Sequence, residues 1–253
     1  MTFIFWHERV MYMLHSTVLC VQRTEAIRYA ARCLEDSGIH ITDKCAPDVT
    51  HVLLPVPSFS NGDEYLAHLL TKLPDDVILC GGNLHSPLTE GYRCVDFLQD
   101  PFYLADNAAI TAKCALSILE HQFSADLKGK QILVIGWGRI GKCLCPILTD
   151  KGANVTAAAR KNTDLAMIHA LGYGSIPISD AAGTTDRFDI ILNTVPVLLF
   201  PQIQVKDGSI IMELASKPGM TGPKIYDGRG LPGKIAPMKS GKLIADTFIR
   251  LLY

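Results

Sequence analysis

The run Gln131–Gly141, QILVIGWGRIG, constrains the fold more than any other part of this chain. Apolar, strand-like residues lead directly into a G-x-G-x-x-G pattern, which is typical of the phosphate-binding turn of a dinucleotide-binding fold. Gly136 would make the tight turn, Gly138 would let a pyrophosphate approach the backbone, and Gly141 would let helix and strand pack closely. The N–H groups and the positive end of the following helix would then face the anion.

The residues on either side of this pattern support the same interpretation. Residues 127–130 form a polar turn of the kind that precedes a strand, and residues 139–150 have the pattern of a helix. Gly152 suits a left-handed helix C-cap, and residues 154–158 indicate a second buried strand. The sequence therefore predicts a β–α–β unit that binds a dinucleotide. The alternative is a glycine-rich turn in an α/β fold that binds nothing.

The residues after the second strand predict which dinucleotide binds. NAD-selective sites usually place Asp or Glu there, where the carboxylate accepts hydrogen bonds from the ribose 2′-OH and repels a 2′-phosphate. This chain instead has Ala159, Arg160 and Lys161, two cations with no carboxylate among them. We therefore predict NADP(H) over NAD(H). The alternative is that the two cations belong only to a solvated loop.

Strands and helices alternate along the whole chain, which predicts an α/β fold with parallel sheets. The length of 253 residues suits two domains of ordinary size. We predict a smaller, flavodoxin-like domain over residues 1–105, which lacks the glycine pattern because Gln22 and Arg23 follow its first strand. A doubly wound domain of the Rossmann type is predicted over residues 106–253, with a linking helix at 106–123. The other predicted helices lie at 24–36, 63–73, 139–150, 162–171 and 240–252, and the predicted strands at 18–21, 40–42, 51–56, 77–80, 131–135, 154–158, 175–177, 189–193 and 209–213.

Composition argues against several other classes of protein. The net charge of −1 gives no reason to expect binding of nucleic acid or of an acidic membrane surface. We expect neither a signal peptide nor a membrane span, and hence a cytoplasmic protein. The eight cysteines are scattered, and Cys143 and Cys145 would point to different faces of one helix, so reduced thiols are expected and no metal site is. A start site at Met11 or Met13 would explain the apolar residues 1–6.

Three polar or turn-rich segments follow strands or precede the last helix of the second predicted domain. They are residues 193–196 (NTVP), 213–219 (ELASKPG) and 230–237 (GLPGKIAP), the last of which we predict to be a rigid loop. In an open α/β sheet, ligands bind beyond the carboxyl ends of the strands. We therefore expect the three segments near the nicotinamide end of the cofactor, although each could also be an ordinary turn.

Several motifs in order along the chain, from about Val18 onward, match those of one known family. They are LPVP at 54–57, GGNL at 81–84, Asn107 with Thr111 and Ala112, VIGWGRIG at 134–141, GANV at 152–155, Ala159 with Arg160, NTVP at 193–196, LASKPG at 214–219 and GLPGKIAP at 230–237. In these motifs the chain resembles the A subunit of dipicolinate synthase. The last two motifs are more specific than the glycine pattern alone.

The resemblance implies an NADP-linked dehydrogenase that oxidises dihydrodipicolinate, derived from 4-hydroxy-tetrahydrodipicolinate of the lysine pathway, to dipicolinate. It implies work in the mother-cell cytoplasm during sporulation, together with a flavoprotein B subunit. Together with the charge argument for Lys161, the predicted cofactor residues are Gly136, Gly138, Arg139, Ile140, Gly141, Ala159, Arg160, Lys161, Asn193, Thr194, Val195, Pro196, Ala215 and Ser216. The predicted substrate and catalytic residues are Asn107, Thr111, Lys217 and Lys234.

Removal of hydride from a dihydropyridine dicarboxylate creates an aromatic ring, so the substrate itself supplies much of the driving force. The protein then mainly has to hold the ring against the nicotinamide and bind two carboxylates. We expect Lys217 and Lys234 to bind one carboxylate, and Thr111 and Asn107 to serve the other.

Two alternatives stay open at this point. A D-2-hydroxyacid dehydrogenase would need a base, generally a histidine in the late loops, but every histidine lies at or before His169. A non-catalytic NADP-binding or regulatory homologue is suggested by Lys113, which stands where the resembled family has Glu. A homodimer is compatible with the low charge and with the small residues on the helix faces.

Overall fold

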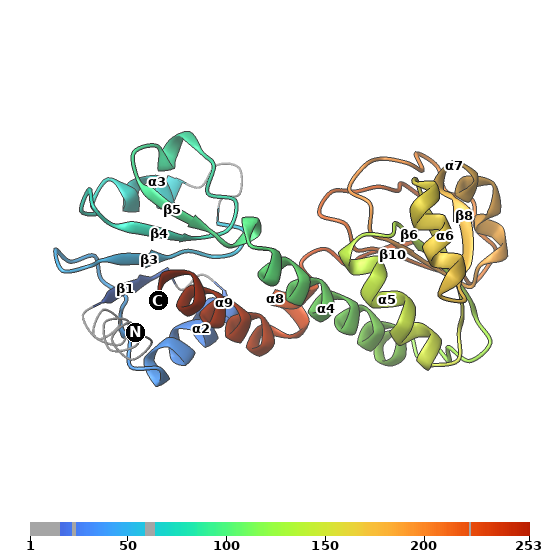
Figure 1. The fold of residues 1–253 in the computed structure, drawn as a ribbon, viewed down its shortest axis with the longest axis horizontal. Coiled ribbons are helices and arrows are strands. Elements are labelled where there is room, and N and C mark those ends of the chain that lie inside the picture. Colours follow the sequence, from blue (N-terminus) through green and yellow to red (C-terminus); the bar gives the residue numbers. More distant parts are fainter. Residues whose placement is uncertain (1–15, 22–23, 59–63, 223) are drawn as a thin grey trace. The chain divides into compact units, whose positions relative to one another are not determined.

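The computed structural model describes residues 16–21, 24–58, 64–222 and 224–253. The proposed start sites Met11 and Met13, and the residues Gln22 and Arg23 after the first strand, lie outside the described residues. The chain divides into two compact units: one holds the described residues up to Asn107 together with Ala236–Tyr253, and the other is Ala108–Ile235 (Figure 1). Each is a parallel sheet covered by helices, so the predicted two-domain α/β fold is confirmed.

The first unit contains a parallel five-stranded sheet with the order β2-β1-β3-β4-β5. This is the flavodoxin-like order that we predict for the first unit. The strands are β1 (Thr17–Cys20), β2 (His40–Thr42), β3 (His51–Leu53), β4 (Ile78–Gly81) and β5 (Arg93–Asp96). Sequence reasoning did not predict β5, because this short edge strand is polar and has no buried residue to mark it.

The helices of the first unit are α2 (Glu25–Asp36), α3 (Glu64–Leu70) and α9 (Pro237–Leu252), with the 3₁₀ turns Pro87–Thr89 and Phe97–Gln99. Thr24 caps α2, because its side chain accepts a hydrogen bond from the backbone N–H of Ile27. The apolar face of α2, with Ile27 and Leu34, is buried in the core of this unit. The periodicity of the sequence therefore predicts this helix correctly.

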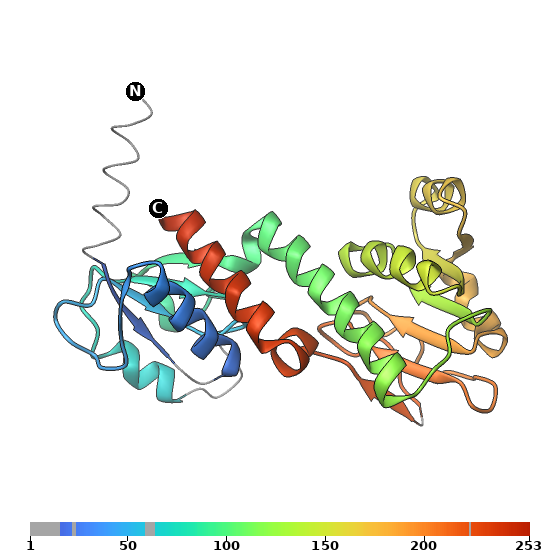
Figure 2. The same cartoon turned by 90° about the horizontal axis from the view of Figure 1, so that it is seen from below.

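The terminal helix α9 belongs to the first unit, whereas the sequence prediction assigned it to the second. Its residues Ile244 and Phe248 join the same buried core as α2. A side chain at Gly241 would collide with the backbone oxygen of Ala26, which shows how closely α9 packs on α2 (Figure 2). Arg250 of α9 also donates hydrogen bonds to the carboxylate of Asp100, at 2.6 and 3.0 Å. Long-range packing, and not order along the chain, decides the unit to which this helix belongs.

The helix α4 (Pro101–Ser117) begins earlier than the predicted helix at 106–123 and continues into a π-helical turn, Ile118–Gln122. Its start is marked by Asp100, whose carboxylate accepts a hydrogen bond of 2.7 Å from the backbone N–H of Tyr103. Proline is favoured in the first turn of a helix, so Asp100 followed by Pro101 was the sequence signal for this boundary. The division between the two units falls within α4, after Asn107.

The second unit contains a parallel six-stranded sheet with the order β11-β10-β9-β6-β7-β8. If β6 is counted as the first strand, this is the doubly wound order 6-5-4-1-2-3. The strands after β6 are added first on one side of it and then on the other, so the topological switch point lies between β6 and β9. The strands are β6 (Gln131–Ile135), β7 (Asn154–Ala159), β8 (Gly174–Pro177), β9 (Ile190–Asn193), β10 (Ile210–Glu213) and β11 (Ile225–Asp227). The helices are α5 (Arg139–Asp150), α6 (Asn162–Ala170), α7 (Ile178–Ala181) and α8 (Leu231–Ile235), and a 3₁₀ segment covers Ala182–Arg187. The predicted strands of this unit are found to within a residue or two, but the short edge strand β11 was missed.

The described residues show the state of the cysteines and whether metal-binding groups or membrane-spanning helices are present among them. All eight cysteines are free thiols. In the described part of the chain, no group of three or more His, Cys, Asp or Glu side chains could hold a metal ion. Among the same residues, no helix has the length and apolar character needed to cross a membrane.

His51 of β3 is a buried titratable group in the first unit, with 2% of its surface exposed. Its Nδ1 lies 2.9 Å from Thr50 Oγ1, and its ring packs edge-on against Phe248 of α9 at 5.7 Å between centroids. Burial, assisted by the positive charge of Arg93, lowers the pKa of His51 from 6.5 to about 4. The folded protein therefore keeps this imidazole neutral at pH values where an exposed imidazole is protonated.

We expect the first unit to lose stability as the pH falls from about 6.5 towards about 4. The unfolded chain takes up a proton on His51 in this window before the folded chain does, which can lower the free energy of unfolding by up to about 3 kcal/mol. Urea unfolding at several pH values measures the slope, and His51→Gln should flatten it. His40→Gln, in the exposed strand β2, should keep the original slope. An unchanged slope in His51→Gln would contradict this account.

Candidate dinucleotide-binding site

The turn between β6 and α5 has the geometry that the glycine pattern predicts. Gly136 adopts a positive φ of 104° and donates a backbone hydrogen bond of 2.9 Å to Ala158 of β7. A side chain at Gly136 would lie 2.5 Å from Thr194 Oγ1, and one at Gly141 would collide with the backbone oxygen of Gly136. Both positions therefore require glycine for the protein's own packing.

Gly138 differs from the other two glycines, because, apart from Gly138 and its two chain neighbours, no described residue has an atom within 4 Å of the position that a Cβ atom would take there. It is the N-cap residue of α5, and no described side chain caps the helix. Because Gly138 has no side chain, the space next to the N–H groups in the first turn of α5 is open. A pyrophosphate needs this arrangement of backbone donors and space.

A cleft of about 450 Å³ opens beside this turn at the carboxyl ends of the strands. Its walls come from the glycine turn, from the end of β7 and the start of α6, and from the loop after β9. Of the predicted cofactor residues, the cleft brings together Gly136, Gly138, Ala159, Arg160, Lys161, Thr194, Val195 and Pro196. The remaining predicted cofactor residues, Arg139, Ile140, Gly141, Asn193, Ala215 and Ser216, do not line this cleft.

Arg160 and Lys161 are exposed at the edge of the cleft. In the part of the chain that the structure describes, neither side chain forms an ion pair. The prediction that no carboxylate is available here is wrong, because Asp164 lines the same cleft from the first turn of α6. The sequence argument considered only the residues directly after the strand, whereas Asp164 lies in the first turn of the following helix α6.

Asn193 at the end of β9 is fully buried, and its side chain is used within the protein. Its Nδ2 donates to both carboxylate oxygens of Glu213, at 2.8 and 3.0 Å, and to the backbone oxygen of Val195 at 3.0 Å. Its Oδ1 accepts from the backbone N–H of Val195 at 3.1 Å. The Asn193 side chain thus joins the loop after β9 to Glu213, and its predicted contact with the cofactor stays a prediction.

Glu213 at the end of β10 is a buried carboxylate to which sequence reasoning assigned no individual role. Only 4% of its surface is exposed, and besides Asn193 it accepts hydrogen bonds from the backbone N–H groups of Ala215, at 3.0 Å, and Gly219, at 2.8 Å. A side chain at Gly219 would lie 2.5 Å from the backbone oxygen of Val195, so the loops after β9 and β10 are in close contact. The sequence signal for this role was a carboxylate at the end of a buried strand, directly before a turn whose backbone N–H groups need acceptors.

Replacement of Glu213 by Gln is expected to lower the free energy of unfolding of the second unit by about 2 to 4 kcal/mol, because the Gln amide nitrogen would face buried N–H donors. Nucleotide affinity should fall as well, since the loop held by Asn193 lines the cleft. Urea unfolding followed by circular dichroism measures the first effect. Asp227→Asn at the exposed end of β11, which loses a surface pair with Arg229, should cost no more than about 1 kcal/mol. Equal effects of the two substitutions would contradict the assignment.

The four predicted substrate residues lie on two helices and one loop. Asn107 and Thr111 are on α4, where Asn107 is half-buried and Thr111 is buried. Lys217 is exposed in the loop after β10, and Lys234 is exposed on α8. Residues 230–237 were predicted as a loop, but Gly230, with a positive φ of 70°, is followed by the short helix α8. The substrate role of these four residues stays a prediction.

Fold and site together define a class of protein. A doubly wound parallel sheet with an open glycine turn at its first helix is a Rossmann-type domain that binds a nicotinamide dinucleotide. In agreement, residues 126–220 match the family described as the NADPH-binding domain of acetohydroxy acid isomeroreductase.

The chain is similar to a particular protein of this class, the A subunit of dipicolinate synthase. Its identity with that protein from Bacillus subtilis (strain 168) is 31% over 137 residues. The match covers 50% of this chain and 46% of the relative, so the chain spans about half the length of that protein. The resemblance predicted from the motifs is thus confirmed.

Solved structures agree with the observed fold. The crystal structure of the dipicolinate synthase A subunit from Bacillus halodurans has a TM-score of 0.77 and 22% identity, and the match covers 95% of this chain and 99% of that one. The structure of the same subunit from Bacillus subtilis has a TM-score of 0.74 and 19% identity, with 94% and 96% covered. At these identities the likeness shows that the two-unit fold is shared.

Proposed function

We propose that this chain is an NADP-linked dehydrogenase that oxidises dihydrodipicolinate to dipicolinate. The observation that carries the proposal is the open glycine turn with two exposed cations, Arg160 and Lys161, in a chain similar to the A subunit of dipicolinate synthase. The same similarity favours this function over a D-2-hydroxyacid dehydrogenase and over a non-catalytic homologue. An alcohol-oxidising enzyme would require a base, generally a histidine, at the site. No histidine is among the described residues that line the cleft.

Each part of the cleft has a task in binding the cofactor. The backbone from Gly138 to Gly141 would bind the pyrophosphate, with Arg139 and Ile140 supplying N–H groups at the helix start. Arg160 and Lys161 would bind the 2′-phosphate through charge-assisted hydrogen bonds. The residues after β9 and β10, including Thr194 to Pro196, Ala215 and Ser216, would border the nicotinamide end, since ligands bind beyond the carboxyl ends of the strands.

The reaction itself moves one hydride and one proton. Bound NADP⁺ would supply the hydride acceptor, and loss of a hydride together with release of one proton to water would make the substrate ring aromatic. The protein has to orient the ring and neutralise two carboxylates. We assign one carboxylate to Lys217 and Lys234 and the other to Thr111 and Asn107, which can donate hydrogen bonds to it.

Formation of dipicolinate tests this function. The purified chain is incubated with NADP⁺ and with lysine-pathway precursor made in situ, and the absorbance of the pyridine dicarboxylate is followed. We expect product from the unsubstituted chain, and a kcat/KM about 10- to 100-fold lower in Lys234→Ala, as for loss of one charged contact. Lys128→Ala, in an exposed turn, serves as the control. NADPH binding without any product, even with the flavoprotein present, would overturn the proposed reaction.

The proposed setting follows from the same similarity. We propose that the chain works with a flavoprotein B subunit in the mother-cell cytoplasm of a spore-forming cell; the homodimer is proposed separately, on the low charge and the small residues of the helix faces. Co-purification of a tagged chain from sporulating cells tests the partnership. A flavoprotein recovered together with the chain supports it, and recovery of the chain alone contradicts it.

A further inference from the structure

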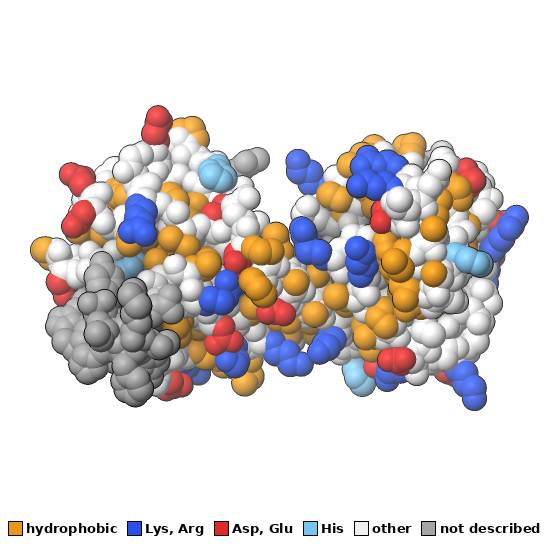
Figure 3. Space-filling view, viewed as in Figure 1, with side chains coloured by type: hydrophobic (Ala, Val, Ile, Leu, Met, Phe, Trp, Pro, Cys, Tyr) orange, Lys and Arg blue, Asp and Glu red, His pale blue; other side chains and the backbone are white. Residues whose placement is uncertain are grey.

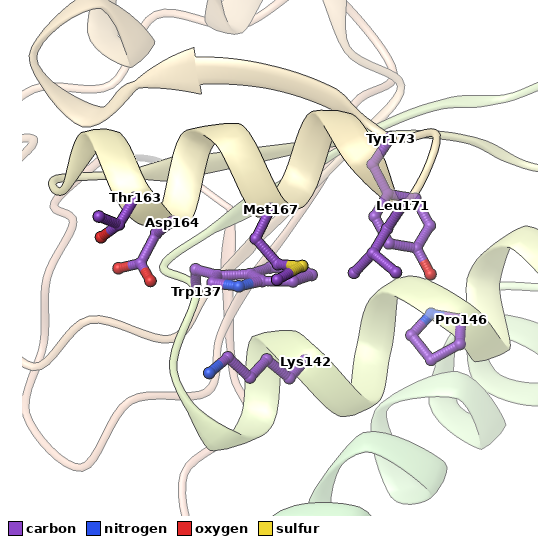
Figure 4. Close-up of a pocket in the computed structure, with 8 residues that line it drawn as sticks. All are labelled: Trp137, Lys142, Pro146, Thr163, Asp164, Met167, Leu171 and Tyr173. Atoms are coloured by element: carbon purple, nitrogen blue, oxygen red, sulfur yellow. The ribbon is translucent and has the colours of Figure 1, made fainter.

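One carboxylate lies in the cleft next to the two cations. Asp164 lines the nucleotide cleft together with Arg160 and Lys161. It also lines a second cavity, of about 540 Å³, between α5 and α6 (Figure 4). Its position in the first turn of α6 is fixed by that helix, whose own start directly follows Lys161.

The carboxylate of Asp164 has no close partner among the described residues. Among these residues, no hydrogen bond or ion pair involves its carboxylate, and Arg160, Lys161 and Lys142 all lie beyond ion-pair distance of it. Figure 4 shows Asp164 and the amino group of Lys142 directed towards the same end of the groove, on either side of Trp137. Figure 3 shows basic side chains beside apolar ones on the face of the second unit that carries α5 and α6. An anion without an ion pair in such a basic surface remains available to a ligand.

Trp137 lines the cavity next to Asp164 and Lys142. The ring lies between α5 and α6, where it packs near Tyr173 with 6.1 Å between centroids and lies beside Met167 (Figure 4). Like Asp164, Trp137 lines both cavities. Asp164 and the indole of Trp137 thus lie together where the two cavities adjoin.

The cations and the carboxylate favour different cofactors. Arg and Lys attract a 2′-phosphate, whereas a carboxylate at the ribose accepts hydrogen bonds from free hydroxyl groups and repels that phosphate. A site with both kinds of group gives each cofactor one favourable set of contacts. The difference in affinity between NADPH and NADH is then smaller than Arg160 and Lys161 alone would produce.

We propose that Asp164 is a specificity-determining residue that offsets Arg160 and Lys161, so that this chain binds both NADPH and NADH with only a modest preference. This inference rests on the proposed use of a nicotinamide cofactor and adds the residue that sets the choice between its two forms. It does not depend on the identity of the substrate.

Calorimetric titration of the full chain with NADPH and with NADH tests the proposal. In Asp164→Asn, NADPH should bind about five- to tenfold more tightly at low salt, because one repulsive charge near the phosphate is lost. NADH should bind a few-fold more weakly, because the amide is a poorer acceptor for the ribose hydroxyls. The gain for NADPH should shrink at high ionic strength.

Two further variants separate this role from a structural one. Asp164→Glu keeps the charge and should keep the ratio of the two dissociation constants within about threefold of the original. Asp150→Asn removes an exposed carboxylate at the other end of α5 and should change neither constant. A merely structural role for Asp164 would change both affinities in the same direction.

The outcomes distinguish the inference from the proposed function. Opposite changes for the two cofactors in Asp164→Asn support the inference. An unchanged ratio, or a parallel change in both constants, overturns the inference and leaves the proposed function standing. Failure of the unsubstituted chain to bind either nucleotide overturns the proposed function and the inference with it.

Discussion

Replacement of Gly138 by Val is expected to weaken NADPH binding at least 100-fold while the protein keeps its fold. Apart from its two chain neighbours, no other described residue has an atom within 4 Å of the Cβ position at Gly138, and its φ of −84° suits any residue. The free energy of unfolding should therefore change by less than about 1 kcal/mol, as for other tolerated surface substitutions. The added side chain would occupy the space next to the first turn of α5 that the pyrophosphate requires.

Two other glycines serve as comparisons for this result. Gly141→Ala should lower both affinity and stability, because the new methyl group collides with the backbone oxygen of Gly136. Gly183→Ala, whose Cβ position is also open but which does not line the cleft, should change neither. Calorimetry with NADPH and urea unfolding measure the two quantities for all three variants. Undiminished binding by Gly138→Val would show that the pyrophosphate does not lie on this turn.

Replacement of both Arg160 and Lys161 by Ser is the second substitution with a large expected effect. Each side chain would form a charge-assisted hydrogen bond with the 2′-phosphate, and loss of both should cost about 3 kcal/mol, or roughly 100-fold in the dissociation constant of NADPH. The affinity for NADH should change by less than about threefold, because NADH lacks this phosphate. The preference of the chain should thus reverse in favour of NADH.

A matched pair of lysines controls for the loss of positive charge. Lys128 and Lys130 are exposed in the turn before β6, at the opposite end of the strand from the cleft. Replacement of both by Ser removes the same charge from the unit and should leave both dissociation constants within about twofold. An equal loss of NADPH and NADH affinity in the Arg160 and Lys161 variant would mean that these cations do not bind the 2′-phosphate.

The local parts of the fold could be predicted well from the sequence. The boundaries of α5 and the turn at Gly136 depend on residues that are neighbours along the chain, so periodicity and glycine spacing indicate them directly. The unit to which α9 belongs depends on packing against α2, more than 200 residues earlier in the chain, which no local pattern encodes. The short edge strands β5 and β11 were missed because few of their side chains are buried.

The site shows the same division. The backbone cradle around Gly138 was predictable because an anion-binding turn needs glycine at fixed spacing. The hydrogen bonds of Asn193 could not be predicted in this way, because a polar side chain at a strand end can bind a ligand or hold a loop. Its bonds to Glu213 are seen only in the folded structure. Asp164 was overlooked because its place in the cleft comes from one turn of helix and not from its distance after the strand.

The most direct test of the whole account is a crystal structure of the full chain with NADPH bound. The account predicts the pyrophosphate on the backbone N–H groups that follow Gly138, and the 2′-phosphate within hydrogen-bond distance of Arg160 or Lys161. A nucleotide bound elsewhere on the chain, or a cleft that excludes NADPH at saturating concentration, would contradict it.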